Sequence, residues 1–107
     1  MSMGSYADAR SALERGETSC ASVVSSFLEV IERSNGKLNA FLHVDADSAL
    51  ARAEELDREI AAGKFRPLTG LVLGVKDLIC VKDSRTTCGS HMLENFVSLY
   101  SATAVAR

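Results

Sequence analysis

The sequence has no tryptophan, a single proline (Pro67) and three cysteines that form no C-x-x-C pair. Because the cysteine count is odd, a disulfide framework is not indicated, and a reducing compartment fits better. The N-terminus has no basic n-region followed by an apolar core, so no signal peptide is expected. The longest apolar run is interrupted by charges and is too short to span a bilayer. We therefore expect a soluble, cytoplasmic protein.

The charges are scattered. Lys and Arg total 12, Asp and Glu total 14, and the formal net charge is −2. There is no basic stripe and no basic patch interleaved with aromatic residues, so nucleic acid is not indicated as a direct ligand of this chain. Gly70 and Gly74 lack the third glycine and the following helix of a phosphate loop. With 107 residues, of which 47% are hydrophobic, the chain can form one small core.

Metal binding is weighed at Cys80, Cys88 and His91. The last two have a ligand-like spacing, and Cys80 could supply a third ligand. Structural zinc sites normally draw on closely spaced ligand pairs, which this sequence lacks. Buried thiols and one loop histidine are the preferred interpretation, so no metal site is expected.

Two amphipathic helices are expected in the first third of the chain. Residues 6–15 can form a short helix. Residues 19–34 form a clearer one, capped by Thr18 or Ser19 and stopped by Asn35-Gly36. The apolar stripe of the second helix comprises Cys20, Val23, Val24, Phe27, Leu28 and Ile31.

A third helix is expected to begin after Asp45 or Asp47 and to end at Gly63. Its charged residues form a solvated face. Its buried face is predicted to comprise Ala46, Ala49, Leu50, Ala53, Leu56 and Ile60.

Two segments are predicted as strands. Residues 38–44 have apolar side chains at period two, and residues 71–75 form a continuous apolar run typical of a strand buried on both faces. The expected fold class is therefore mixed α/β, with three helices packed on one or two strands of a larger mixed sheet. Alone, residues 71–75 would expose unpaired strand edges.

Lys76 and Asp77 interrupt the most apolar part of the chain, between Val75 and Leu78. Two interpretations are open. A lysine held in apolar surroundings loses hydration and becomes a usable base near neutral pH. Alternatively, a buried strand stops at Val75 and the two charges mark its solvated end.

Residues 68–96 resemble the first signature block of the amidase-signature family, Gly-hydrophobic-Pro-hydrophobic-x-hydrophobic-Lys-Asp. The continuation R-T-T-C-G-S-x-M-L-E-N-F, at residues 85–96, is similar to the glutaminase subunits of tRNA-dependent amidotransferases within that family. Residues 101–105 are similar to the D-A-T-x-V that opens the next helix of those proteins. The resemblance covers essentially the whole chain, including the order of its upstream elements.

Three residues depart from the family pattern. Val72 stands where a proline is usual, and Ser101 where an aspartate is usual but still offers a capping oxygen. Asp83 stands where a glycine is common, so a tight turn at this position is less strongly predicted.

The resemblance implies amide hydrolysis by a nucleophilic serine, a bridging serine and a buried lysine base. Lys76 matches the lysine, whereas both serines belong to a Gly- and Ser-rich signature that these 107 residues lack. Residues 1–107 are therefore expected to be the N-terminal fragment of a single amidase domain, truncated before that signature. The final residues, which begin a helix too short to be stable alone, fit this expectation. The isolated chain is predicted to be inactive, with no nucleophile, metal or cofactor site of its own.

The resemblance also implies partners, the B and C subunits of such an amidotransferase. The parent of this chain would hydrolyse glutamine and pass ammonia to the B subunit, which amidates glutamate on tRNA(Gln) with ATP and Mg, while the C subunit wraps around the glutaminase. The tRNA would be reached through the complex, and no membrane is involved. Two alternatives stay open: a fragment of another amidase-signature hydrolase acting on a small amide, and a non-catalytic helical module that binds a partner.

Overall fold

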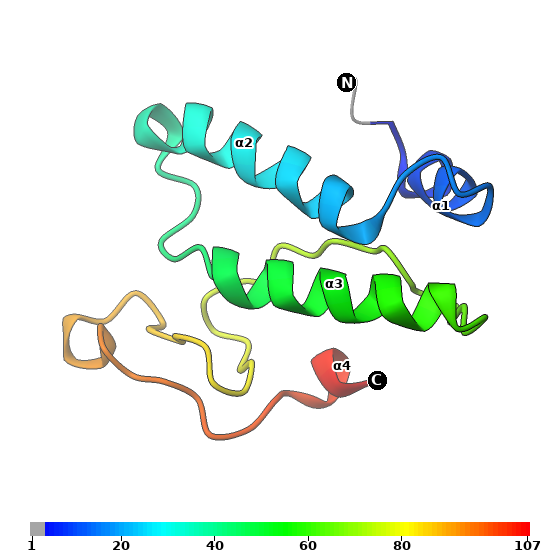
Figure 1. Ribbon diagram of the computed structural model, residues 1–107. Helices are drawn as coiled ribbons and strands as arrows, with labels where there is room; N and C mark the ends of the chain where they lie inside the picture. Colours follow the sequence, from blue (N-terminus) through cyan, green and yellow to red (C-terminus); the bar gives the residue numbers. More distant parts are fainter. Residues whose placement is uncertain (1–3) are drawn as a thin grey trace. The chain divides into compact units, whose positions relative to one another are not determined.

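The computed structural model describes residues 4–107, which form two compact units divided between Val72 and Leu73. The first unit contains helices α1 (Tyr6–Glu14), α2 (Cys20–Leu38) and α3 (Ala46–Ala61). The second contains the short 3-10 helix η1 (His91–Leu93) and the terminal α4 (Thr103–Ala106), joined by irregular chain (Figure 1). All three predicted helices are confirmed.

Helix α1 begins with a capping box. The Ser5 hydroxyl accepts the N–H of Asp8, and the Asp8 carboxylate accepts the N–H of Ser5, with an N···O distance of 2.9 Å. The hydrogen bonds from the Ser5 hydroxyl and N–H lower the pKa of Asp8. These bonds satisfy N–H groups that the first turn of a helix leaves without partners.

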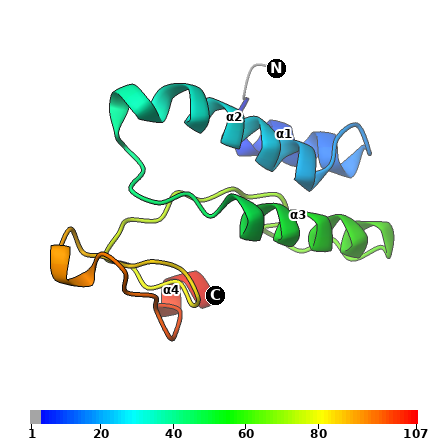
Figure 2. The same cartoon turned by 60° about the vertical axis from the view of Figure 1, so that its left-hand side comes forward.

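Helices α2 and α3 form an antiparallel hairpin connected by residues 39–45 (Figures 1 and 2). Ser19 caps α2, as predicted, by accepting the N–H of Ser22. The core of the unit lies where the hairpin meets α1 and the chain after α3. Its buried centre is Leu13, Cys20 and Ala53, with Ala21, Val24, Leu56, Ile60 and Phe65 packed against it.

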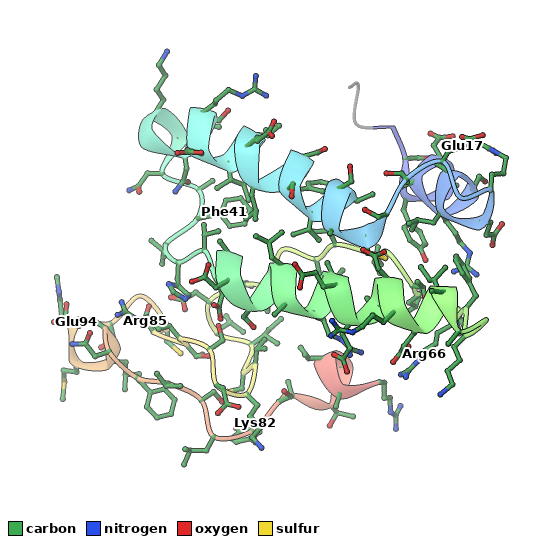
Figure 3. The ribbon with its side chains drawn as sticks, viewed as in Figure 1. Glu17, Phe41, Arg66, Lys82, Arg85 and Glu94 are labelled. Atoms are coloured by element: carbon green, nitrogen blue, oxygen red, sulfur yellow. The ribbon has the colours of Figure 1, made fainter. Side chains whose placement is uncertain are left out.

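The end of α2 corrects two predictions. Asn35-Gly36 does not stop the helix, which continues to Leu38 and ends at the left-handed Asn39 (φ 49°). The Asn35 side chain instead bonds both the N–H and the C=O of Phe41, at 2.9 and 3.0 Å. The strand predicted over residues 38–44 is therefore wrong. Its first residue is helical, and the bonds from Asn35 hold the rest in a loop, from which Phe41 points toward the space between α2 and α3 (Figure 3).

The strand predicted over residues 71–75 is also absent from the described part of the chain. A strand needs a neighbour for its ladder of hydrogen bonds, and residues 4–107 provide none for this segment. Their one β-type pairing is an isolated antiparallel bridge between Arg85 and Val97. The mixed sheet of the predicted fold class is thus not seen within these residues, although the helices are.

The segment after α3 is fastened to α1. The Tyr6 hydroxyl donates to the C=O of Thr69 at 3.2 Å, and the Arg10 guanidinium donates to the C=O of Arg66 at 3.1 Å. The Arg10 guanidinium also lies 4.6 Å from the centre of the Phe65 ring. These contacts place the start of the apolar run, residues 68–72, against the helical unit.

The start of α4 differs from expectation as well. The predicted cap, Ser101, uses its hydroxyl to accept the N–H of Lys82 at 3.0 Å, and Ala102 occupies the N-cap position. Ser101 therefore ties the chain before α4 to the turn at residues 81–84.

Candidate functional site

Lys76 lies in the second unit, and its side chain is exposed. Its C=O accepts the N–H of Ile79 at 2.9 Å, which forms a turn directly after the extended segment. Within the described residues this fits the interpretation that the two charges mark a solvated end. Its apolar neighbours form no core around it: Val75 is 42% exposed and Leu78 is 56% exposed. The role of Lys76 as a buried base stays a prediction.

Asp77, by contrast, is held on several sides. Its Oδ1 accepts the N–H of Thr87 at 2.8 Å, while Oδ2 accepts the Thr87 hydroxyl and, at 3.4 Å, the N–H of Gly89. Its C=O accepts the N–H of Cys88 at 2.8 Å. The bonds from the Thr87 hydroxyl and N–H lower the pKa of the Asp77 carboxyl.

The loop that Asp77 binds has an unusual backbone. Cys88 is left-handed with φ 52° although it carries a side chain, and Gly89 follows with φ 68°. Thr86, just before the bonded residues, is 3% exposed, and within the described residues its hydroxyl has no hydrogen-bond partner. Ser90 closes the loop by capping η1 through the N–H of Met92.

The candidate metal ligands Cys80, Cys88 and His91 do not form a metal site in the described residues. Within residues 4–107 there is no group of three or more His, Cys, Asp or Glu side chains that could hold an ion. Cys80 lies against Tyr100 and raises the pKa of that hydroxyl, while Cys88 is exposed. His91 is fully exposed and lies 3.8 Å from Glu94.

The role of Asp77 does not follow from the sequence. Its place beside Lys76 predicts only a second charge, whereas the structure makes it the anchor of residues 87–89. A local signal existed, since carboxylates readily accept hydrogen bonds from nearby backbone N–H groups in turns. The partner, ten residues further along the chain, has no sequence signal.

A second feature lies in the first unit. A mostly apolar cavity of about 430 Å³ opens between the start of α1, the first half of α2 and the residues that precede Leu73. It is lined by Gly4, Ser5, Tyr6, Asp8, Ala9, Ala12, Thr18, Val23, Ser26, Phe27, Gly70, Leu71 and Val72. No helix within residues 4–107 combines the length and apolarity needed to cross a membrane.

Comparison with known proteins identifies relatives of the whole chain. The Amidase family model matches residues 22–107. The A subunit of glutamyl-tRNA(Gln) amidotransferase from Salinibacter ruber is 50% identical over 107 residues, which is 100% of this chain and 21% of the relative. Proteins of the same description from Roseiflexus sp. and Thioalkalivibrio sulfidiphilus are 47% and 45% identical, each over 94% of this chain and about a fifth of their own length. The chain therefore spans about a fifth of the curated relatives it matches.

Proposed function

This chain belongs to the amidase family, and on that premise we propose that it is the N-terminal segment of the glutaminase subunit of a tRNA-dependent amidotransferase. The proposal rests on the 50% identity, over all 107 residues, to the A subunit of a glutamyl-tRNA(Gln) amidotransferase. As the N-terminal fragment of a single amidase domain, the segment would supply the lysine of a Ser–Ser–Lys arrangement.

In this proposal Lys76 acts as the general base. Its neutral amine takes a proton from a bridging serine, which takes one from the nucleophilic serine as that oxygen attacks the side-chain amide carbon of glutamine. The protonated Lys76 returns that proton through the bridging serine to the amide nitrogen, so the tetrahedral intermediate expels ammonia and leaves an acyl-enzyme. Water then hydrolyses the acyl-enzyme to glutamate. Both serines would come from polypeptide outside these 107 residues, so the chain alone would be inactive.

Such a role requires a change in the surroundings of Lys76, which is exposed here. We propose that residues 71–75 pair with strands outside this chain to form a mixed sheet. The exposed side chains of Leu73 and Val75, 66% and 42% accessible, support this because they are apolar and have no core of their own. Packing on that sheet would also remove water from around Lys76.

The same proposal brings in the expected assembly. The B and C subunits would complete the enzyme in the cytoplasm, with ATP and Mg bound by the partner that amidates glutamate on tRNA(Gln). The tRNA would contact the complex rather than this segment, whose net charge is −2.

A glutaminase assay tests the proposal. The chain alone should release no ammonia from glutamine, whereas a form extended through the serine-rich signature should do so. Turnover by the short chain would show that the nucleophile lies within these 107 residues. Turnover of simple amides but not of glutamine by the extended form would favour another amidase-signature hydrolase.

The cavity in the first unit favours a second candidate, a helical module that binds the C subunit. Hydrogen exchange across α1 and α2, measured with and without that partner, tests this docking. Stronger protection of residues that line the cavity would support docking, and unchanged protection would count against it.

A further inference from the structure

Asp77 accepts four hydrogen bonds, and they converge on one short loop. Its carboxylate accepts bonds from the Thr87 N–H, the Thr87 hydroxyl and the Gly89 N–H, while its own C=O accepts the Cys88 N–H. One residue therefore fixes three consecutive residues through both its side chain and its backbone. Bonds to an ionised carboxylate are stronger than bonds between neutral groups.

The loop needs such an anchor. A left-handed conformation is unfavourable for a residue with a side chain, and Cys88 adopts one at φ 52° immediately before Gly89 at φ 68°. Conformations of this kind persist where the surrounding contacts over-determine them. The four bonds from Asp77 provide that constraint, so loosening Asp77 would release the loop.

The backbone of Lys76 is fixed by the same arrangement. Its C=O is bonded to Ile79, and the next residue is bonded to the loop, so the direction in which its side chain leaves the backbone is set. Both oxygens of the Asp77 carboxylate accept bonds from the loop, so its charge is engaged there.

We propose that Asp77 is a positioning residue for Lys76: it fastens the backbone that carries the lysine to the loop at residues 87–89 and keeps its own charge engaged there. The inference rests on the proposed function, in which Lys76 is the base. Asp77 would contact neither the substrate nor the nucleophile, and would act only by positioning Lys76.

The first test measures the fastening in the full-length protein that contains this segment. Asp77→Asn keeps the size of the side chain but replaces one acceptor oxygen with a donor. Hydrogen exchange in a peptide that covers residues 86–90 should accelerate about 10-fold or more. A peptide that covers residues 81–84, whose turn is closed by the Ser84 N–H on Val81, should exchange as in the wild type. Unchanged exchange at residues 86–90 would overturn the proposal.

The second test is glutaminase kinetics in the same enzyme, assembled with its partner subunits. Asp77→Asn should lower kcat about 10- to 100-fold, the order expected for a misplaced catalytic group, with KM for glutamine within about twofold. Thr87→Val removes one donor to Asp77 and should lower kcat less, and Thr87→Ser should recover much of that loss. Asp83→Asn removes another carboxylate of the same unit and serves as the matched control.

The outcomes separate this inference from the proposed function. If Lys76→Ala keeps wild-type turnover, the assignment of the base fails and Asp77 has nothing to position. If Lys76→Ala is inactive while Asp77→Asn and Thr87→Val keep wild-type kcat, the positioning role alone is overturned. A loss expressed in KM rather than kcat, or an equal loss in Thr87→Ser and Thr87→Val, would also overturn it.

Discussion

Asp57, on α3, caps the first turn of α2: its Oδ1 accepts the N–H of Cys20 at 2.7 Å, and its Oδ2 accepts the N–H of Ala21 at 3.1 Å. The first turn of a helix leaves N–H groups without partners and carries a partial positive charge, so a carboxylate there is favourable. Ser19 bonds the N–H of Ser22 on the same turn. The helix hairpin is therefore joined by polar bonds as well as by its apolar core.

Asp57→Ala should lower the free energy of unfolding of the first unit by about 1–2 kcal/mol, in the range of a lost helix cap. The reason is that two buried or half-buried N–H groups lose their acceptor. Urea unfolding followed by circular dichroism at the helical wavelength measures the change. Asp57→Asn, which keeps one acceptor oxygen, should lose less. Glu54→Ala, on the exposed face of the same helix, should stay within about 0.5 kcal/mol of the wild type, and an equal loss there would contradict the capping role.

Cys20 should be the least reactive thiol of the chain. Burial, followed by the nearby Asp57 carboxylate, raises its pKa from 9.0 to about 11, whereas Cys88 is exposed. The native fold thus favours the protonated thiol. The stability that this raised pKa of Cys20 contributes is fully present below pH 9 and is lost as the pH rises through about 11. Alkylation at pH 8 followed by mass spectrometry should label Cys88 first and Cys20 last. Equal native labelling rates would contradict this assignment.

Asp83→Gly should stabilise the turn at residues 81–84. Asp83 has φ 64°, in the left-handed region that glycine enters without steric cost. We expect a gain of up to about 0.5 kcal/mol for glycine, offset in part by its greater freedom when unfolded, and a loss of about 1–2 kcal/mol for Asp83→Val. The N–H groups of Asp83, Ser84 and Ser98 donate to the C=O groups of Ser98, Val81 and Ser84, respectively. Hydrogen exchange of these three amides measures the change in stability. A destabilised Asp83→Gly variant would contradict it.

Gly70→Ala should cost more than Gly63→Ala, although both glycines are left-handed, at φ 83° and φ 81°. A Cβ at Gly70 would overlap the Cδ1 of Leu13, which is buried, whereas a Cβ at Gly63 meets nothing within 4 Å. We expect about 1–2 kcal/mol for the backbone strain at Gly63, and a further 1–3 kcal/mol, roughly, for overpacking at Gly70. Thermal unfolding of the Gly63→Ala and Gly70→Ala variants measures the difference, which is the cost of overpacking against Leu13. Equal losses of stability in the two variants would show that Leu13 moves aside freely.

The helices could be predicted from sequence because their determinants are local. The apolar stripe of α2 and its Ser19 cap are confirmed, and α3 ends just before Gly63 as expected. The end of α2 could not be read because Asn35 serves as a side-chain clamp for Phe41 rather than as a helix stop. Composition does not distinguish those two uses of asparagine.

Strands and the setting of Lys76 depend on partners far along the polypeptide. Residues 71–75 have the composition of a buried strand, but a strand exists only with a neighbour, and the described residues offer none. The same holds for desolvation of Lys76, which requires surrounding chain that its immediate neighbours do not provide. The anchoring of Asp77 by Thr87 was missed for a related reason, because the pairing of two loops leaves no periodic pattern.

The most direct measurement of the central claim is glutamine turnover by the full-length Lys76→Ala protein, assembled with its partners and shown by circular dichroism to be folded. The account predicts that ammonia release falls to the uncatalysed background while the complex still assembles. Turnover that stays near the wild-type rate would contradict the assignment of this lysine as the base.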